Sequence, residues 1–293
     1  MEAIRESPLL RLPEPGEQAD AGVYLLLPHP SDSDRPIPEL PNLSMPVWAV
    51  VGLDGRLLMP VRPVSAAAPF DIRDNLEKCV RYAQTLSLTN PNEGALRRDC
   101  IDFALLRQGS SGTWCEAGEE RVAGGLPLFY AGERIAFSVA NRHEWPVYVC
   151  VLDFGLTGAI TQLHPDHGVS EPLLPGRTLR RGILPGDENF LFLPDDFPFA
   201  PDPEDGLPTG GIETYKLFVT GRPADFGWLE QGWMRAASVG AQLPVRRLFD
   251  LAYAGIGDRG PQPVPPDADE AWTTVERSFR LQRHVEGAAG GDG

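Results

Sequence analysis

The segment His164-Pro-Asp-His167 carries the side chains of this chain that are best suited to metal chemistry. Two imidazoles and a carboxylate are ligands that zinc and similar ions accept. A loop interrupted by proline does not hold both rings on one face, as a helical i, i+4 pair does, and a complete site needs three or four ligands. The segment therefore indicates either part of a metal site, built on His164, Asp166 and His167, or a surface loop. The surface loop is favoured, and no metal or other cofactor is predicted.

Cys150 and His164 are the side chains to consider as a nucleophile and its base. Catalytic cysteines lie in electropositive, partly exposed positions that favour the thiolate. Cys150 stands between Val149 and Val151 in the most apolar stretch of the chain, where burial favours the neutral thiol. Nucleophile-elbow, phosphate-loop and dinucleotide-binding motifs are absent from the sequence. No catalytic residue is predicted, and the chain is expected not to be an enzyme.

Residues 187–205 combine seven acids with four phenylalanines and no base. The acids lack the spacing of a calcium loop. They favour either a solvated flap or a surface that attracts a basic protein partner and then buries apolar area. The candidate contacts lie in this segment and in the aromatic segment 226–234, which alternatively packs in the core: Asp195, Asp196, Asp202, Asp205, Phe226, Trp228 and Trp233. Nearby, Arg177, Arg180 and Arg181 are expected to pair with the acids or to hold an anion.

Composition excludes several classes of function. The 293 residues carry a formal net charge of −15, which argues against nucleic-acid binding and against anionic membrane surfaces. Acidic residues at the start of the chain differ from a secretory signal, and no window holds 18 consecutive apolar residues. Four cysteines without a Cys-x-x-Cys pair are typical of reduced packing residues. A cytoplasmic protein is expected.

The elements that position these residues are mainly strands. The apolar run 147–152, followed by Gly155, Gly158 and an alternating stretch, predicts a hairpin whose first strand, 147–153, lies at the centre of the core. Asp54-Gly55 predicts a second hairpin with a type I′ turn. Residues 101–107, 128–130 with 134–140 as a pair, and 272–281 predict further strands.

Helical signals are fewer. An apolar stripe from Ile72 to Leu86 predicts a helix that begins at Asp71 as its N-cap and packs on a sheet. Residues 224–234 and 244–254 predict two short helices. The fold class expected is an antiparallel β-sandwich-like core with a few short helices. Its expected divisions are an N-terminal part at 1–95, the sandwich at 96–285 and a disordered tail at 286–293.

The order of several segments carries a family resemblance. Tyr130-Ala-Gly-Glu-Arg-Ile-Ala-Phe-Ser-Val-Ala-Asn141 precedes the 147–160 run and His164-Pro165, and then come Leu174-Pro-Gly-Arg177, Gly211-Ile-Glu-Thr-Tyr-Lys-Leu-Phe-Val-Thr220 and Ala224-Asp-Phe226. Over about residues 96–235 the chain resembles the β-rich domain of unknown function that accompanies bacterial caspase-like peptidase domains.

That resemblance implies an accessory module without the peptidase. Caspase-like catalysis needs a His-Gly pair after an apolar strand and a nucleophilic Cys followed by His or Ser. His167-Gly168 follows Pro165 and Asp166 instead, and no cysteine has that setting. The implied function is recognition of a protein or peptide partner, with a caspase-like protease as the partner to test. The alternative from another class is a metal-dependent hydrolase or metal sensor that uses His164, Asp166 and His167.

Overall fold

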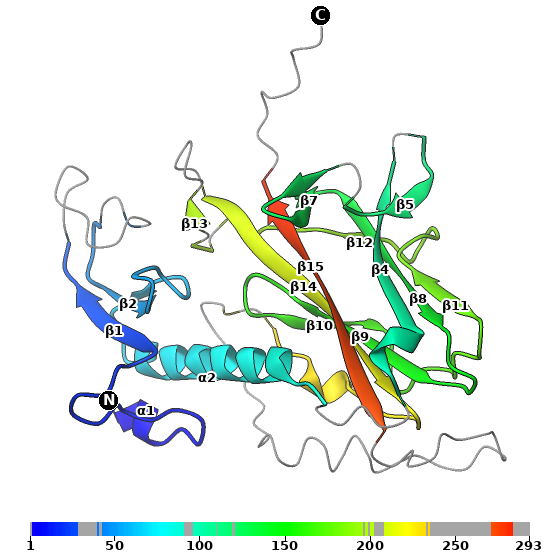
Figure 1. The fold of residues 1–293 in the computed structure, drawn as a ribbon. Coiled ribbons are helices and arrows are strands. Elements are labelled where there is room, and N and C mark those ends of the chain that lie inside the picture. The colour runs from blue at the N-terminus through cyan, green and yellow to red at the C-terminus, as the bar shows by residue number, and fades with distance from the viewer. Residues whose placement is uncertain are drawn as a thin grey trace, which may run out of the picture.

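Two β-sheets face each other in the computed structural model, and a long helix joins them to a third, smaller sheet (Figure 1). The structure describes residues 2–28, 40, 43–90, 96–109, 111–118, 121–195, 197–198, 200–201, 208–232, 234 and 271–283. Strands dominate these residues, as the turn-rich sequence predicts. The β-rich, sandwich-like fold class is confirmed.

The larger sheet has seven strands in the order β10-β9-β14-β15-β7-β6, with β13 paired to β14. Its bounds are β6 Val122–Ala123, β7 Leu126–Tyr130, β9 Tyr148–Phe154, β10 Ile160–His164, β13 Ala200–Pro201, β14 Pro208–Thr220 and β15 Trp272–Gln282. All pairs are antiparallel except β15 with β7. The predicted central strand, β9, is an inner strand, but the middle of the sheet belongs to the longer β14 and β15.

The facing sheet has five strands in the order β11-β8-β4-β5, with β12 paired to β8. Its bounds are β4 Ile101–Gln108, β5 Trp114–Glu116, β8 Arg134–Asn141, β11 Thr178–Arg181 and β12 Asn189–Phe190; a 3-10 turn, η1 Arg98–Cys100, precedes β4. The prediction that 128–130 pairs with 134–140 is wrong, since β7 and β8 belong to different sheets. Ala131 donates its backbone N–H to Gln282 O of β15, so the chain turns a corner there instead of closing a hairpin.

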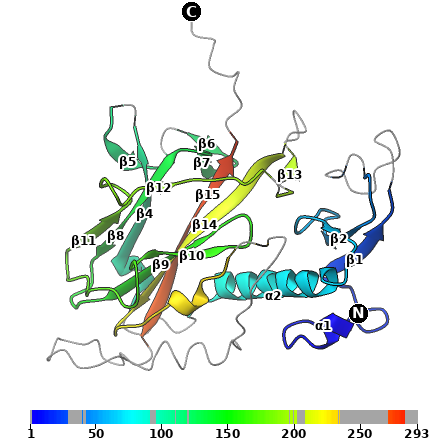
Figure 2. The same cartoon turned by 180° about the vertical axis from the view of Figure 1, so that it is seen from behind.

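The main core lies between the two sheets (Figure 2). Along β4 the inward residues Ile101, Phe103 and Leu105 alternate with more exposed ones, the period of two that a strand with one buried face requires. Edge-to-face aromatic contacts cross the core, with Phe137 and Tyr215 ring centroids 6.3 Å apart. This is the packing of a sandwich, in which both inner faces interdigitate.

The outer face of the larger sheet is covered by α2 Ala68–Ser87 and by residues 224–229, which include the 3-10 turn η2 Gly227–Leu229. Residues Cys150, Leu152, Phe154 and Phe218 of the sheet pack there against Tyr82 and Leu86 of α2. The predicted helix over 224–234 is wrong beyond this single turn, and the one over 244–254 lies outside the described residues.

The predicted N-cap of α2 at Asp71 is four residues late. The helix begins at Ala68, whose N–H donates to Ser65 Oγ at 3.2 Å, and Ala67 occupies the N-cap position. A proline in the first turn provides a φ that already suits a helix and lacks an N–H that would go unpaired. Proline at this position therefore moves the start upstream of the acidic residue that looked like the cap.

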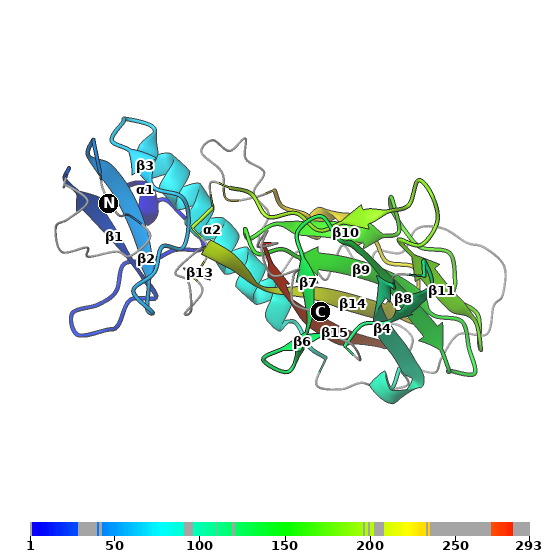
Figure 3. The ribbon, with the colours of Figure 1, turned by 90° about the horizontal axis from the view of Figure 1, so that it is seen from above.

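The third sheet lies at the other end of α2, apart from the sandwich (Figure 3). It consists of β1 Ala21–Leu26, β2 Val47–Gly52 and β3 Arg62–Pro63, with a short helix, α1 Glu2–Arg5, beside it. The hairpin at Asp54-Gly55 exists, but its turn is not the two-residue one. Gly52 and Arg56 close a three-residue loop in which Gly55 has a positive φ of 79°.

The hairpin between β9 and β10 has a three-residue loop of the same type. Gly155 N donates to Ala159 O and Gly158 N to Gly155 O, each at 3.0 Å, and Gly158 has φ 74°. Glycine is needed at that one position because the left-handed conformation disfavours a side chain. The prediction of a hairpin over 147–163 is confirmed.

Candidate functional site

Residues 189–193 present two phenylalanines on a fixed backbone. Asn189 and Phe190 pair with β8, and Leu191 exchanges backbone hydrogen bonds with Gly132 and Glu133 at 2.8 and 3.0 Å. Leu191 and Leu193 are both 6% exposed, whereas Phe190 is 64% and Phe192 63% exposed. The leucines anchor the segment in the core, so the phenyl rings on either side of Leu191 are held toward solvent. Exposed aromatic side chains on rigid backbone are suited to protein recognition.

The described acids around these rings are paired within the chain. Asp187 accepts from Gly182 N at 2.9 Å and lies 3.7 Å from Arg181 Nε. Asp195 accepts from Arg283 at 2.6 Å, but its side chain is 92% exposed, so this pair contributes little to stability. The prediction that the basic cluster pairs with the acids is confirmed for Arg181.

Other predicted contact residues fall elsewhere. Asp196, Asp202, Asp205 and Trp233 lie outside the described residues. Phe226 is 6% exposed and its ring centroid lies 4.9 Å from that of Phe218, so its place is the core and its assignment to a partner surface is corrected. Trp228 is partly buried, and its indole N–H donates to Asp225 O at 2.8 Å. The exposed phenylalanines flanking Leu191 were not singled out as contacts, although the alternation of residues 190–193 signals them.

The His164 segment is organised around an arginine. Arg181 donates to Asp166 Oδ1, and its cation together with burial lowers the pKa of His164 to about 4, burial being the larger cause. The Nδ1 atom of His164 is fully enclosed. Because Asp166 is engaged by a cation, a metal ion would have to displace it. Among the described residues, no group of three or more His, Cys, Asp or Glu side chains could hold a metal ion.

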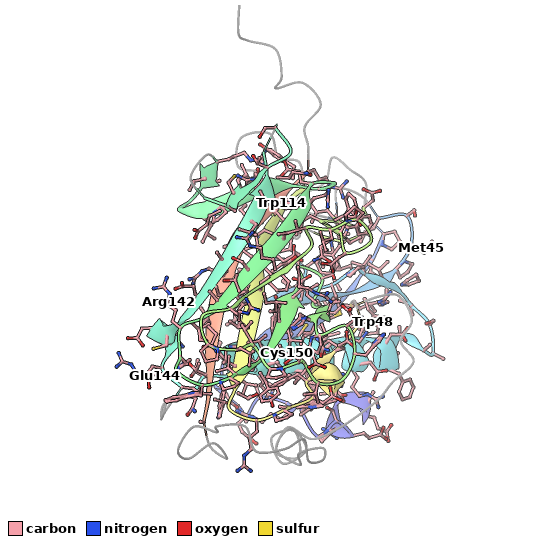
Figure 4. The ribbon with its side chains drawn as sticks, turned by 90° about the vertical axis from the view of Figure 1, so that its right-hand side faces the viewer. Met45, Trp48, Trp114, Arg142, Glu144 and Cys150 are labelled. Carbon is pink, nitrogen blue, oxygen red and sulfur yellow. The ribbon has the colours of Figure 1, made fainter. Side chains whose placement is uncertain are left out.

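Cys150 lies on the outer face of the larger sheet, beneath α2, and is 2% exposed. Burial raises the pKa of its thiol well above the ordinary value, which favours the neutral form. The polar contact of Sγ is with Gln162 Oε1, at 3.8 Å, and not with an imidazole nitrogen. Figure 4 shows Cys150 within the fold, in contrast to Arg142 and Glu144, which project from its edge. This environment opposes a nucleophilic role.

Two carboxyl groups, Asp153 and Glu213, lie on the inner face of the larger sheet, near one end of β9 and β14. Asp153 lies opposite Tyr215 in the β9–β14 register, and Glu213 lies two residues before Tyr215, on the same face of β14. Gly155 leaves room for the second carboxyl group, since a Cβ there would be 3.2 Å from Glu213 Oε1. Asp153 Oδ1 and Glu213 Oε2 are fully enclosed without a hydrogen-bond partner, although Asp153 as a whole remains partly accessible.

Burial governs the protonation of this pair. It raises the pKa of Asp153 to about 7, and a hydrogen bond from Glu213 partly offsets that rise. Burial also raises the pKa of Glu213 well above its ordinary value, and the charge of Asp153 adds to the effect. Two carboxyl groups so close and so enclosed do not both ionise readily. The arrangement can therefore hold a proton near neutral pH.

Sequence reasoning did not identify this pair, although a signal existed. On β14 the inward positions run Glu213, Tyr215, Leu217 and Val219, and on β9 they run Val149, Val151 and Asp153. Each acid thus continues an inward series of period two. Whether the two acids lie side by side depends on the register between β9 and β14, which the pattern of each strand does not specify.

Comparisons with protein families, curated proteins and solved structures find no match to this chain. No helix in the described part of the chain is long and apolar enough to cross a membrane. The function is therefore inferred from the geometry of these side chains and from the order of the sequence segments.

Proposed function

We propose that the chain is a non-catalytic accessory module of a bacterial caspase-like protease or signalling system, and that it binds a protein or peptide partner. The observation that carries the proposal is the pair Phe190 and Phe192, each more than 60% exposed on a backbone anchored by buried leucines. The segment resemblance supplies the protease context. The buried, protonated Cys150 is consistent with a module that does no chemistry.

The partner's surface is inferred to be apolar with basic residues around it. Two outward phenyl rings bury apolar area on contact, and truncation of such an aromatic anchor costs about 1 to 2 kcal/mol or more. The net charge of −15 favours a cationic surface and speeds the encounter. Because Asp187 and Asp195 are engaged by arginines, the rings are assigned the larger share of the affinity.

A displayed peptide library tests the proposal directly. The purified chain is expected to enrich peptides that combine Lys or Arg with apolar residues, and Phe190→Ala with Phe192→Ala is expected to weaken their binding by more than about tenfold. Ile212→Ala is the matched control, because Ile212 is 50% exposed on β14. Enrichment that is unchanged in the double variant contradicts the assignment of the rings. Peptide hydrolysis by the chain, abolished by Cys150→Ala, contradicts the non-catalytic function.

A further inference from the structure

Within the described residues, the carboxyl pair Asp153–Glu213 has no counter-charge. No ion pair in the described part of the chain includes either residue, and the electrostatic influence on each comes from the other. The titratable groups that respond to the pair are Tyr82 of α2 and Tyr215 of β14. Burial raises the pKa of each phenol, and the charges of both acids raise it further. Both phenols are neutral near pH 7. Full ionisation would therefore place two negative charges together without a balancing cation among the described side chains.

The pair lies directly beneath the turn that joins β9 to β10. Asp153 is two residues before Gly155, where the turn begins, and Glu213 Oε1 fills the space beside Gly155. Tyr82 Oη of α2 donates to Phe154 O at 3.1 Å, so the helix contacts the same strand end. Movement of either carboxyl group is thus transmitted to this turn and to α2.

The same turn connects the sandwich to the rest of the molecule. Met234 N donates to Thr157 O at 3.2 Å, and Met234 Sδ lies 3.3 Å from the place of a Cβ on Gly158. Met234 also belongs to the cluster of Val50, Met59 and Ile72 that joins the third sheet to α2. Residues 155–159 with Met234 therefore form a joint between the sandwich and the N-terminal sheet.

We propose that Asp153 and Glu213 form a proton-binding site that keeps this joint closed. The closed molecule retains at least one proton between the two carboxyl groups. Loss of the shared proton separates them by repulsion, loosens the turn at 155–159 and releases Met234. The site thereby couples the arrangement of the N-terminal sheet to pH. This inference does not depend on the proposed partner surface.

The direction of the pH effect is set by the raised pKa of each acid. The folded chain binds the protons more tightly than the unfolded chain, whose Asp and Glu titrate at about 4. The stabilisation is complete below that pH and is lost as pH rises through the folded values, for Asp153 about 7. The pKa of His164 is lowered to about 4, so its contribution to the free energy of unfolding rises with pH up to about pH 6.5, opposite to that of the carboxyl pair. A test at pH 6.5 to 8.5 separates the two.

Urea unfolding across that range tests the proposal. The unfolding constant of the wild-type chain is expected to rise with pH, by up to about tenfold per pH unit for each linked proton. This increase of the unfolding constant with pH is expected to be smaller in Asp153→Asn and in Glu213→Gln. In the double variant the part of the increase that comes from the pair is expected to be absent. Glu116→Gln, on an exposed residue of β5, keeps the wild-type profile. Variants whose profiles match the wild type overturn the proposal.

Two measurements on the folded chain complete the test. Infrared spectroscopy of the wild type at pH 6.5 is expected to show a protonated carboxylic acid band that weakens toward pH 8.5. Absence of that band overturns the proposal even where the variants do not fold. Hydrogen exchange at Gly158, Ile160 and Met234 is expected to accelerate with pH beyond its chemical rate. Unchanged protection of these amides overturns the link to the joint.

Discussion

Replacement of Lys216 by Met is expected to detach the end of α2 from the sheet. The Lys216 side chain is 0% exposed, and its Nζ donates to Leu86 O and, at 2.7 Å, to Glu276 Oε1. Leu86 O is one of the carbonyls at a helix C-terminus that lack a partner within the helix. The last turn of α2 contains no basic residue, so the sheet supplies the cation that this end favours.

The loss of stability expected for Lys216→Met depends on what each of the two Lys216 contacts contributes. A hydrogen bond from a charged group contributes about 1.5 to 3 kcal/mol, and a buried acceptor left unpaired costs about 1 to 3 kcal/mol. Glu276 is 43% exposed, so its share of the ion pair is discounted to about 0 to 1 kcal/mol. Burial lowers the pKa of Lys216, and the loss of that desolvation cost offsets part of the damage. The net loss expected for Lys216→Met is about 2 kcal/mol.

Urea unfolding of Lys216→Met and Glu276→Gln at pH 7 distinguishes the two contacts. Glu276→Gln is expected to cost less than about 1 kcal/mol. Equal losses in both variants would show that Lys216 serves the ion pair and not the helix end. A Lys216→Met chain as stable as the wild type would refute the reasoning, because hydrophobic burial would then compensate fully for the lost donor.

Local patterns were sufficient for most individual elements. The strands at 101–107, 147–153 and 272–281 were predicted because apolar runs and alternation depend only on neighbouring residues. The start of α2 was missed because the proline of its first turn and Ser65 both lie upstream of the apolar stripe. The corner at Ala131 was missed because its outcome depends on Gln282, which lies more than a hundred residues away.

Prediction of the candidate site is limited in the same way, by contacts between residues that lie far apart in the chain. Pairing of Arg181 with an acid was predictable, since the charges lie close in sequence and attract in any compact arrangement. The proximity of Asp153 and Glu213 was not, because like charges are expected to avoid one another. The β9–β14 register, with Asp153 opposite Tyr215, brings them together at the end of strands stabilised by apolar packing. The free energy of that packing outweighs the burial of one carboxyl pair.

Two further predictions concern neighbouring positions on β9 and β10. Cys150→Asp, and equally Val149→Asp, is expected to prevent folding because each buries a carboxylate without a partner; a soluble variant with an ordinary melting temperature would show that this strand is placed wrongly. For His164 the folded pKa of about 4 lies below the unfolded value of about 6.5. The unfolded chain then binds the extra proton between these values, so the His164 contribution to stability rises from pH 4.5 to pH 6.5 and is lost as pH falls. Allowing for partial exposure, this gain is about 1 to 2 kcal/mol. Unfolding free energies at the two pH values, compared with those of His164→Gln, measure the gain directly, since the carboxylates common to both chains cancel. An equal gain in the variant would mean that the imidazole is already hydrated in the folded chain, and that burial and the Arg181 cation do not hold it neutral.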